Sequence, residues 1–142
     1  MSTYDPNAIR AQIKTLLQTV TEISYVYDYR TSNIEGYPSI IFDMTNEEGD
    51  MLDDSNNIRK ITFTIWIVCE LKVAGSSTSK TILDNATKAV INILEKKSND
   101  TLSGTVDWTM PVMGQRSEIQ TPEGTTIYQE VKLLCNVAST IL

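Results

Sequence analysis

Histidine is absent from the 142 residues of the sequence, and it is the side chain that most often acts as a general base near neutral pH or as a zinc ligand. Nucleophilic catalysis would then need a lysine or a carboxylate as its base. Ser77 and Lys80 match a bare Ser-x-x-Lys spacing, but they lie where a helix is expected to begin and where hydroxyl side chains serve as caps. We therefore expect a protein that is not an enzyme.

Glycine is sparse, and the six glycines form no glycine-rich loop. The stretch 73–81 follows an expected strand, opens an expected helix and ends in Lys80 and Thr81, as a phosphate-binding loop does, but Ser79 stands where such a loop has its second glycine. We expect a turn between a strand and a helix at this place, and no bound cofactor.

Clustered basic residues and long apolar runs are missing as well. The chain has 12 Lys and Arg against 18 Asp and Glu, which gives a net charge of −6, and its tightest basic cluster is Lys96-Lys97. Binding to phosphates needs clustered positive charge, and a membrane span needs about 20 apolar residues. Since the first residues also lack the features of a signal peptide, we expect a protein of the cytoplasm that is not a general binder of nucleic acids or membranes.

Cysteine is limited to two residues, Cys69 and Cys135, which lie inside apolar strand-like runs. Free cysteine is among the most buried residue types, and disulfides are rare in the cytosol. We expect two buried free thiols.

The apolar pattern predicts two helices and five strands. Asp5 and Pro6 suit the N-cap and the first position of a helix, and apolar residues then recur at helical spacing up to Val20. The second helix is expected to bury a stripe that begins with Ile82 and Leu83. Helices are expected over 5–20 and 78–96, strands over 24–30, 37–44, 58–71, 105–113 and 125–138, and polar connections over 45–57 and 114–124.

This order, α-β-β-β-α-β-β, predicts a single α+β domain over residues 1–142, with a mostly antiparallel β-sheet and two α-helices packed on one face. Segment 58–71 is the clearest strand, because β-branched and aromatic residues fill almost every position. At about 3.3 Å per residue it would span roughly 45 Å. We expect it to bend or to extend beyond the body of the domain.

Acidic residues concentrate between positions 43 and 54, which hold six of the 18 acids and no Lys or Arg. They are Asp43, Glu47, Glu48, Asp50, Asp53 and Asp54. Carboxylates can bind calcium, but this spacing does not match the usual calcium-binding loop. The alternatives are a solvated loop, or an acidic surface that takes part in assembly or faces a polyanion.

Trp66 and Trp108 are candidates for anchors in a subunit interface, because tryptophan is enriched at binding hot spots. Packing in the core is the alternative for each. Tyr25, Tyr27 and Tyr29 share one face of the first expected strand and allow the same two interpretations.

The order of elements resembles that of the tail terminator proteins of tailed bacteriophages and, more loosely, of their head-tail connector and neck proteins. The features that carry the likeness are a short helix ending near Val20, the segment 35–42 leading into a strand, the long strand at 59–67, the Ser- and Thr-rich helix start at 76–81, and a closing long-stranded hairpin. The likeness spans nearly the whole chain and includes no catalytic or ligand-binding motif.

The resemblance implies a structural virion protein that forms a hexameric ring on a completed tail tube, stops tube growth and docks the head-tail connector. Its partners would be copies of itself, the tube protein and the neck proteins, while DNA passes through the lumen without specific binding. The subunit interface or lumen would then involve Glu47, Glu48, Asp50, Asp53, Asp54, Trp66 and Trp108. The alternatives are another neck, head-completion or baseplate protein, or a small metal- or ligand-binding domain that uses the acidic 43–54 loop.

Overall fold

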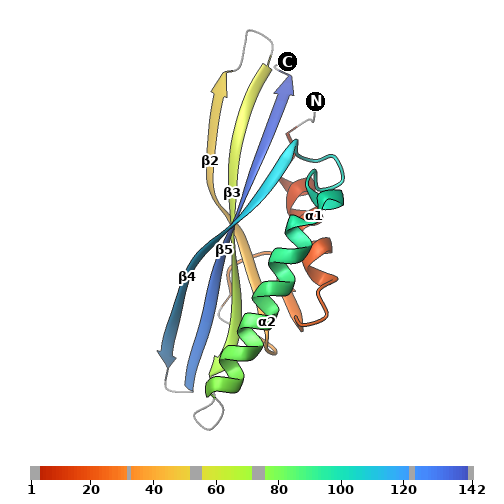
Figure 1. The fold of residues 1–142 in the computed structure, drawn as a ribbon. Helices are drawn as coiled ribbons and strands as arrows, with labels where there is room; N and C mark the ends of the chain where they lie inside the picture. The colour runs from red at the N-terminus through yellow and green to blue at the C-terminus, as the bar shows by residue number, and fades with distance from the viewer. Residues whose placement is uncertain (1–3, 32, 52–55, 72–75, 122–123, 141–142) are drawn as a thin grey trace.

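A five-stranded sheet forms the frame on which both helices pack (Figure 1). The computed structural model describes residues 4–31, 33–51, 56–71, 76–121 and 124–140. The strand order is β1-β2-β3-β5-β4, in which β1 runs parallel to β2 and all other neighbours are antiparallel. The elements are α1 (Pro6–Gln18), β1 (Tyr25–Tyr27), β2 (Ser39–Met51), β3 (Asn56–Leu71), α2 (Ser76–Glu95), the short 3-10 helix η2 (Lys97–Asn99), β4 (Trp108–Thr121) and β5 (Gly124–Thr140). The predicted fold class and element order are confirmed.

Helix α1 begins as the sequence predicts. The Oδ1 atom of Asp5 accepts hydrogen bonds from the backbone N–H groups of Asn7 at 3.1 Å and Ala8 at 3.2 Å. Pro6 occupies the first turn, where its missing N–H costs nothing. Ile9, Ile13 and Leu17 are fully buried, because a spacing of four residues keeps them on one face.

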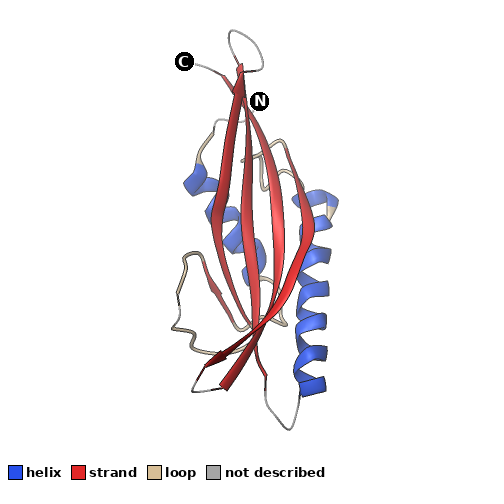
Figure 2. Cartoon of the chain, turned by 90° about the vertical axis from the view of Figure 1, so that its left-hand side faces the viewer, coloured by secondary structure: helices blue, strands red, loops and turns tan. Residues whose placement is uncertain are grey.

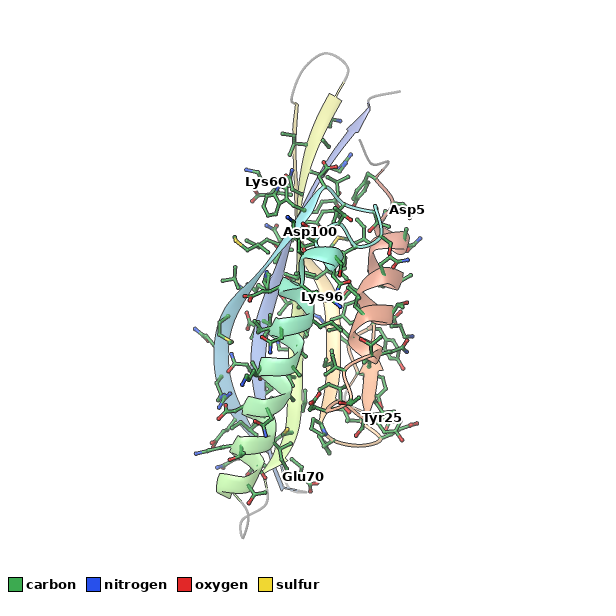
Figure 3. All side chains as sticks on the ribbon, turned by 45° about the vertical axis from the view of Figure 1, so that its right-hand side comes forward. Asp5, Tyr25, Lys60, Glu70, Lys96 and Asp100 are labelled. Atoms are coloured by element: carbon green, nitrogen blue, oxygen red, sulfur yellow. The ribbon has the colours of Figure 1, made fainter. Side chains whose placement is uncertain are left out.

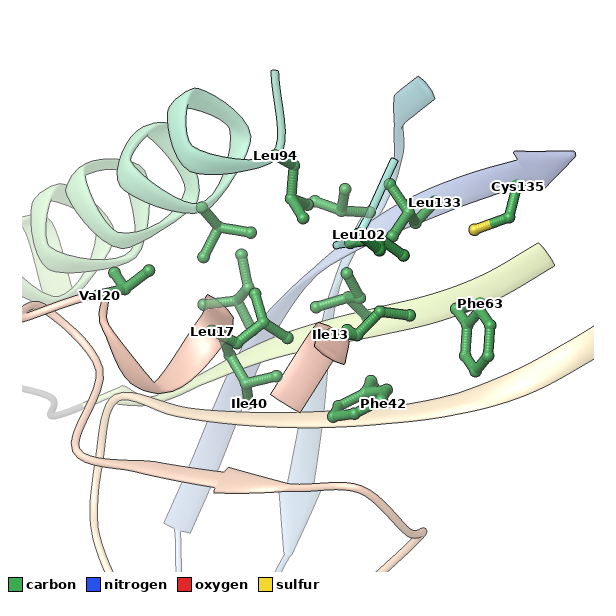
Figure 4. Packing of buried hydrophobic residues seen from close by; sticks show 14 of the residues in the cluster. Ile13, Leu17, Val20, Ile40, Phe42, Phe63, Leu94, Leu102, Leu133 and Cys135 are labelled. Atoms are coloured by element: carbon green, nitrogen blue, oxygen red, sulfur yellow. The ribbon is translucent and has the colours of Figure 1, made fainter. Parts of the chain in front are cut away.

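The core lies between the two helices and the inner face of the sheet. Every second residue of β3 from Ile61 to Cys69 is buried, and the neighbours of this row on β5 are the buried row from Ile127 to Val137. Phe42 and Phe63 belong to this core, and their ring centroids lie 6.3 Å apart. Figure 4 shows them in the cluster with Ile13 and Leu17 of α1. Both cysteines are buried and free, as predicted.

Both helices lie on the same face of the sheet, as predicted, so the strands stand in front of them when the other face is viewed (Figure 2). Helix α2 buries Leu83, Ala86, Val90 and Leu94. The expectation that Ile82 belongs to the buried stripe is wrong, because it is 43% exposed near the start of the helix.

The predicted polar loop over 45–57 is mostly strand. Strand β2 continues to Met51 and β3 already begins at Asn56. The ladder continues because β3 supplies paired backbone groups throughout, with Glu48 opposite Lys60 and Gly49 opposite Arg59. We call residues 45–51 and 56–61 the acidic ribbon. The far ends of β2, β3 and β5 extend beyond both helices in Figure 1, which confirms the expected extension of the long strand.

The predicted flexible connection over 114–124 is also mostly strand, because β4 runs to Thr121. Its pairing with β5 shifts between Met113 and Arg116, which is a β-bulge. Gly114 lies in this bulge, where a Cβ atom would come within 2.9 Å of Glu130 Cγ. A glycine at this place therefore lets the strand continue past the bulge.

Candidate functional site

Glu47 and Glu48 lie exposed on the acidic ribbon, but basic residues of β3 face them. Arg59 Nη1 donates a hydrogen bond to Glu47 Oε1 at 3.0 Å, and the Arg59 guanidinium lies 4.7 Å from the ring centroid of Tyr4. Burial raises the pKa of Tyr4 to about 12, and the hydrogen bond to Glu47 acts in the same direction. With Lys60 opposite Glu48, the described part of the ribbon carries charges of both signs.

The other acids predicted as site residues are Asp50, Asp53 and Asp54. Asp50 lies on β2 with its backbone opposite Ile58, whereas Asp53 and Asp54 fall outside the described residues. Within the described ranges, no three acidic or cysteine side chains are grouped so that they could hold a metal ion. A role of these acids in a lumen or interface stays a prediction.

The two tryptophans lie on the sheet face that the helices leave uncovered, at separate places. Trp66 is partly buried on β3, and the guanidinium carbon of Arg30 lies 5.2 Å from its ring centroid. Trp108 begins β4, is 45% exposed, and shares a row with Lys60. Trp108 lies in the row of Lys60, and this row is about 20 Å from the row of Trp66 along the strands. The structure therefore does not bring the two predicted anchors together.

The β4 edge carries most of the exposed apolar side chains. In the sheet formed by the described residues, β4 is an outer strand and pairs only with β5. Nine large apolar side chains are exposed among these residues, and five of them belong to β4: Trp108, Met110, Val112, Met113 and Ile119. By register, Met113 lies on the helix face and the other four on the uncovered face. Only Trp108 was predicted as a site residue, although the alternation of Trp108, Met110 and Val112 is visible in the sequence.

Three further exposed side chains, Tyr25, Tyr29 and Tyr37, lie at the opposite edge of the sheet, beside β1. The rings of Tyr25 and Tyr27 stack at 6.4 Å, and those of Tyr27 and Tyr29 meet edge to face at 6.0 Å. We call Tyr25, Tyr27 and Tyr29 the tyrosine ladder. Figure 3 shows Tyr25 on the far side of the molecule from β4.

A hydrogen-bond network centred on the buried side chain of Gln129 holds β4 in place. Gln129 of β5 donates from Nε2 to the backbone carbonyl of Gly114 in the bulge at 3.1 Å and to that of Glu130 at 3.0 Å. Its Oε1 accepts from Arg116 Nε at 3.0 Å, and Arg116 Nη2 lies 2.6 Å from Asp84 Oδ1 on α2. In the sequence, Gln129 is recognisable only as a polar residue that interrupts an apolar row. Its hydrogen bond to the bulge at Gly114 could not be predicted, because the bulge depends on the pairing of β4 with β5.

A groove of about 340 Å³ lies between α2 and β4. Its walls include the apolar side chains of Ile91 and Met113, and Lys88 and Asn92 contribute polar groups. Met113 is 56% exposed, so the groove is open at the same edge as the exposed residues of β4.

A second hollow, of about 600 Å³, lies near the end of β3 and the start of α2. Cys69, Glu35, Glu70 and Ser79 contribute to its lining. Burial raises the pKa of the Cys69 thiol to about 11, although Arg116 acts in the opposite direction. A protonated thiol is a poor nucleophile at neutral pH, so Cys69 is not activated for catalysis.

Comparisons with known proteins give a limited result. No family model matches the chain, and no curated protein matches it. Among solved structures, the chain is similar to one in the virion of a native gene transfer agent particle, with 13% sequence identity, a TM-score of 0.45, and coverage of 94% of this chain and 93% of that chain. A likeness at this level carries no information on function. None of the described helices is both long and apolar enough to cross a membrane.

Proposed function

We propose that this chain is a structural protein of a tailed-phage particle, a tail terminator that forms a ring on the end of the tail tube. The sequence resemblance suggests the role, and the distribution of exposed apolar side chains supports it. Eight of the nine such side chains among the described residues lie at the two edges of the sheet. Exposed apolar groups gathered in this way are typical of surfaces that bind other proteins.

The positions of the two edges favour a ring over a two-fold dimer. The β4 edge and the β1 edge lie on opposite sides of one sheet. When the β4 edge of one copy contacts the β1 edge of another, each copy still has one edge free to bind a further copy. Contacts of this kind repeat from copy to copy and close when the rotation between copies allows it. Six copies are the number that the resemblance implies. Such a ring would cover the tube end, stop its growth and offer its other side to the neck proteins.

Electron microscopy of the purified protein, alone and mixed with tail tubes, tests the proposal. We expect rings of uniform diameter with six-fold symmetry, either free or seated on tube ends, and we expect seated rings to stop tube growth. A protein that stays monomeric in both samples and leaves tube growth unchanged would contradict the proposal. Rings that bind no tube end would instead favour another neck or baseplate role.

We also infer that the acidic segment from Glu47 to Asp54 faces the lumen or a neighbouring subunit, where negative charge would keep passing DNA from binding. Replacing all five acids between Glu47 and Asp54 by their amides should reduce assembly or DNA passage, measured as phage infectivity. A partial control neutralises two exposed acids outside this segment, Glu22 and Glu95. Normal infectivity of the five-acid variant would exclude this placement.

A further inference from the structure

We propose that, in such a ring, the β4 edge of one copy docks against the tyrosine ladder of the next copy, and that Tyr29 enters the groove between α2 and β4. The inference rests on the proposed function, because it requires copies of the chain to associate. The occupant of the β4 edge is thus a second copy of this chain.

The chemistry of the two edges is complementary. The groove has apolar walls at Ile91 and Met113 and polar groups at Lys88 and Asn92. A tyrosine fits such a place, because its ring fills an apolar space while its hydroxyl finds a polar partner. Methionine adapts to an incoming ring and makes favourable sulfur–aromatic contacts.

Tyr29 is the tyrosine best placed to enter the groove. It is 57% exposed, more than Tyr25 or Tyr37, and it lies at the end of the ladder. Behind it, the ring of Tyr27 is held by a hydrogen bond to its Oη from the backbone N–H of Glu35 at 3.1 Å. A side chain on such a support loses little freedom when it binds, which favours affinity.

A continuous backbone ladder between two β4 strands is disfavoured. Pro111 has no N–H to donate, and the bulge after Met113 interrupts the strand. Docking at this edge therefore depends on side chains, and the exposed apolar residues of β4 supply them. This is a further reason to expect a contact between unlike edges.

Disulfide trapping tests the contact. A disulfide needs Cβ atoms about 3.5 to 4.5 Å apart, so it forms only where two side chains meet. We expect the double variant Tyr29→Cys/Met113→Cys to give a ladder of covalent oligomers up to the ring size on oxidation, with tail tubes present if rings need them. Each single variant should give none, and an equal mixture of the two should give dimers. The native thiols are buried, so the wild-type chain serves as the background control.

The outcomes separate this inference from the proposed function. Rings without a covalent ladder, or dimers from Met113→Cys alone, would overturn the docking arrangement while leaving the ring in place. Absence of rings and of tube capping by the wild-type chain would overturn the proposed function itself.

Sedimentation gives a second measurement. We expect Tyr29→Ala to weaken association by about tenfold or more, which corresponds to about 1.4 kcal/mol, and Tyr29→Phe to weaken it less. The matched control is Ile82→Ala, since Ile82 is the ninth exposed apolar side chain and lies on α2 outside both the tyrosine ladder and the groove beside β4. Thermal melting shows whether each variant is folded. An equal effect of Tyr29→Ala and Ile82→Ala would contradict the inference.

Discussion

At the scale of single residues, Gln129 has the clearest stabilising role. It is buried and bonded to the Gly114 carbonyl, to the Glu130 carbonyl and to Arg116. Gln129→Leu keeps the approximate shape but leaves these groups without their partner, so we expect a loss of about 1–3 kcal/mol in the free energy of unfolding. Urea denaturation measures it. Glu118→Gln, an exposed change on the neighbouring strand β4, should cost less than about 0.5 kcal/mol.

The two buried thiols predict a loss of stability at alkaline pH. Burial raises the pKa of Cys69 from 9.0 to about 11 and that of Cys135 from 9.0 to about 12. The unfolded chain therefore releases these protons first, and the free energy of unfolding falls as the pH rises from about 9 toward 12. Cys135→Ala should make this fall shallower when urea denaturation is repeated over the pH range. An unchanged slope would show that the thiol does not contribute.

At the scale of elements, the β4 bulge depends on a glycine. A methyl group at position 114 would lie 2.9 Å from Glu130 Cγ and 3.0 Å from its Cβ, and the Cβ cannot move without the backbone. We expect Gly114→Ala to destabilise the fold by about 1–3 kcal/mol. Gly49→Ala is the matched control in another strand, because its nearest neighbour would be Arg59 Nη1 at 3.7 Å, an ordinary contact. Similar melting temperatures for the two variants would contradict this account of the bulge.

The sequence predicted best those elements that contact the core. The cap at Asp5 and the alternation along β3 are local, and burial on one side leaves a clear period. The acidic ribbon and the far half of β4 leave the core, so polar residues are tolerated on both of their faces and the period disappears. The candidate site residues, too, could be predicted only where a local signal in the sequence marks them. Trp108 was found by residue type, whereas the exposed row at Met110 and Val112 gains its meaning only from the edge position of β4, which depends on long-range pairing.

At the scale of the whole molecule, one core joins both helices to the inner face of the sheet. The two edges are therefore fixed relative to each other, and a contact at one edge presents the other at a defined angle. This rigidity is what a closed ring requires, because repeated contacts must meet after a set number of copies. In such a ring, the contact between copies would set the orientation of the uncovered sheet face and of the acidic ribbon.

Association should also be visible in stability. If copies join at the sheet edges, the melting temperature should rise with protein concentration, because association stabilises only the folded chain. For a chain of this size, each kcal/mol of stabilisation is worth roughly 4 °C. Val112→Glu places a charge on the exposed row of β4 and should abolish the concentration dependence, while leaving the melting temperature of the dilute protein nearly unchanged. Ile82→Glu, on α2, should keep the dependence. Calorimetry over a wide concentration range makes the comparison, and a rise of equal size in both variants would mean that the copies meet elsewhere.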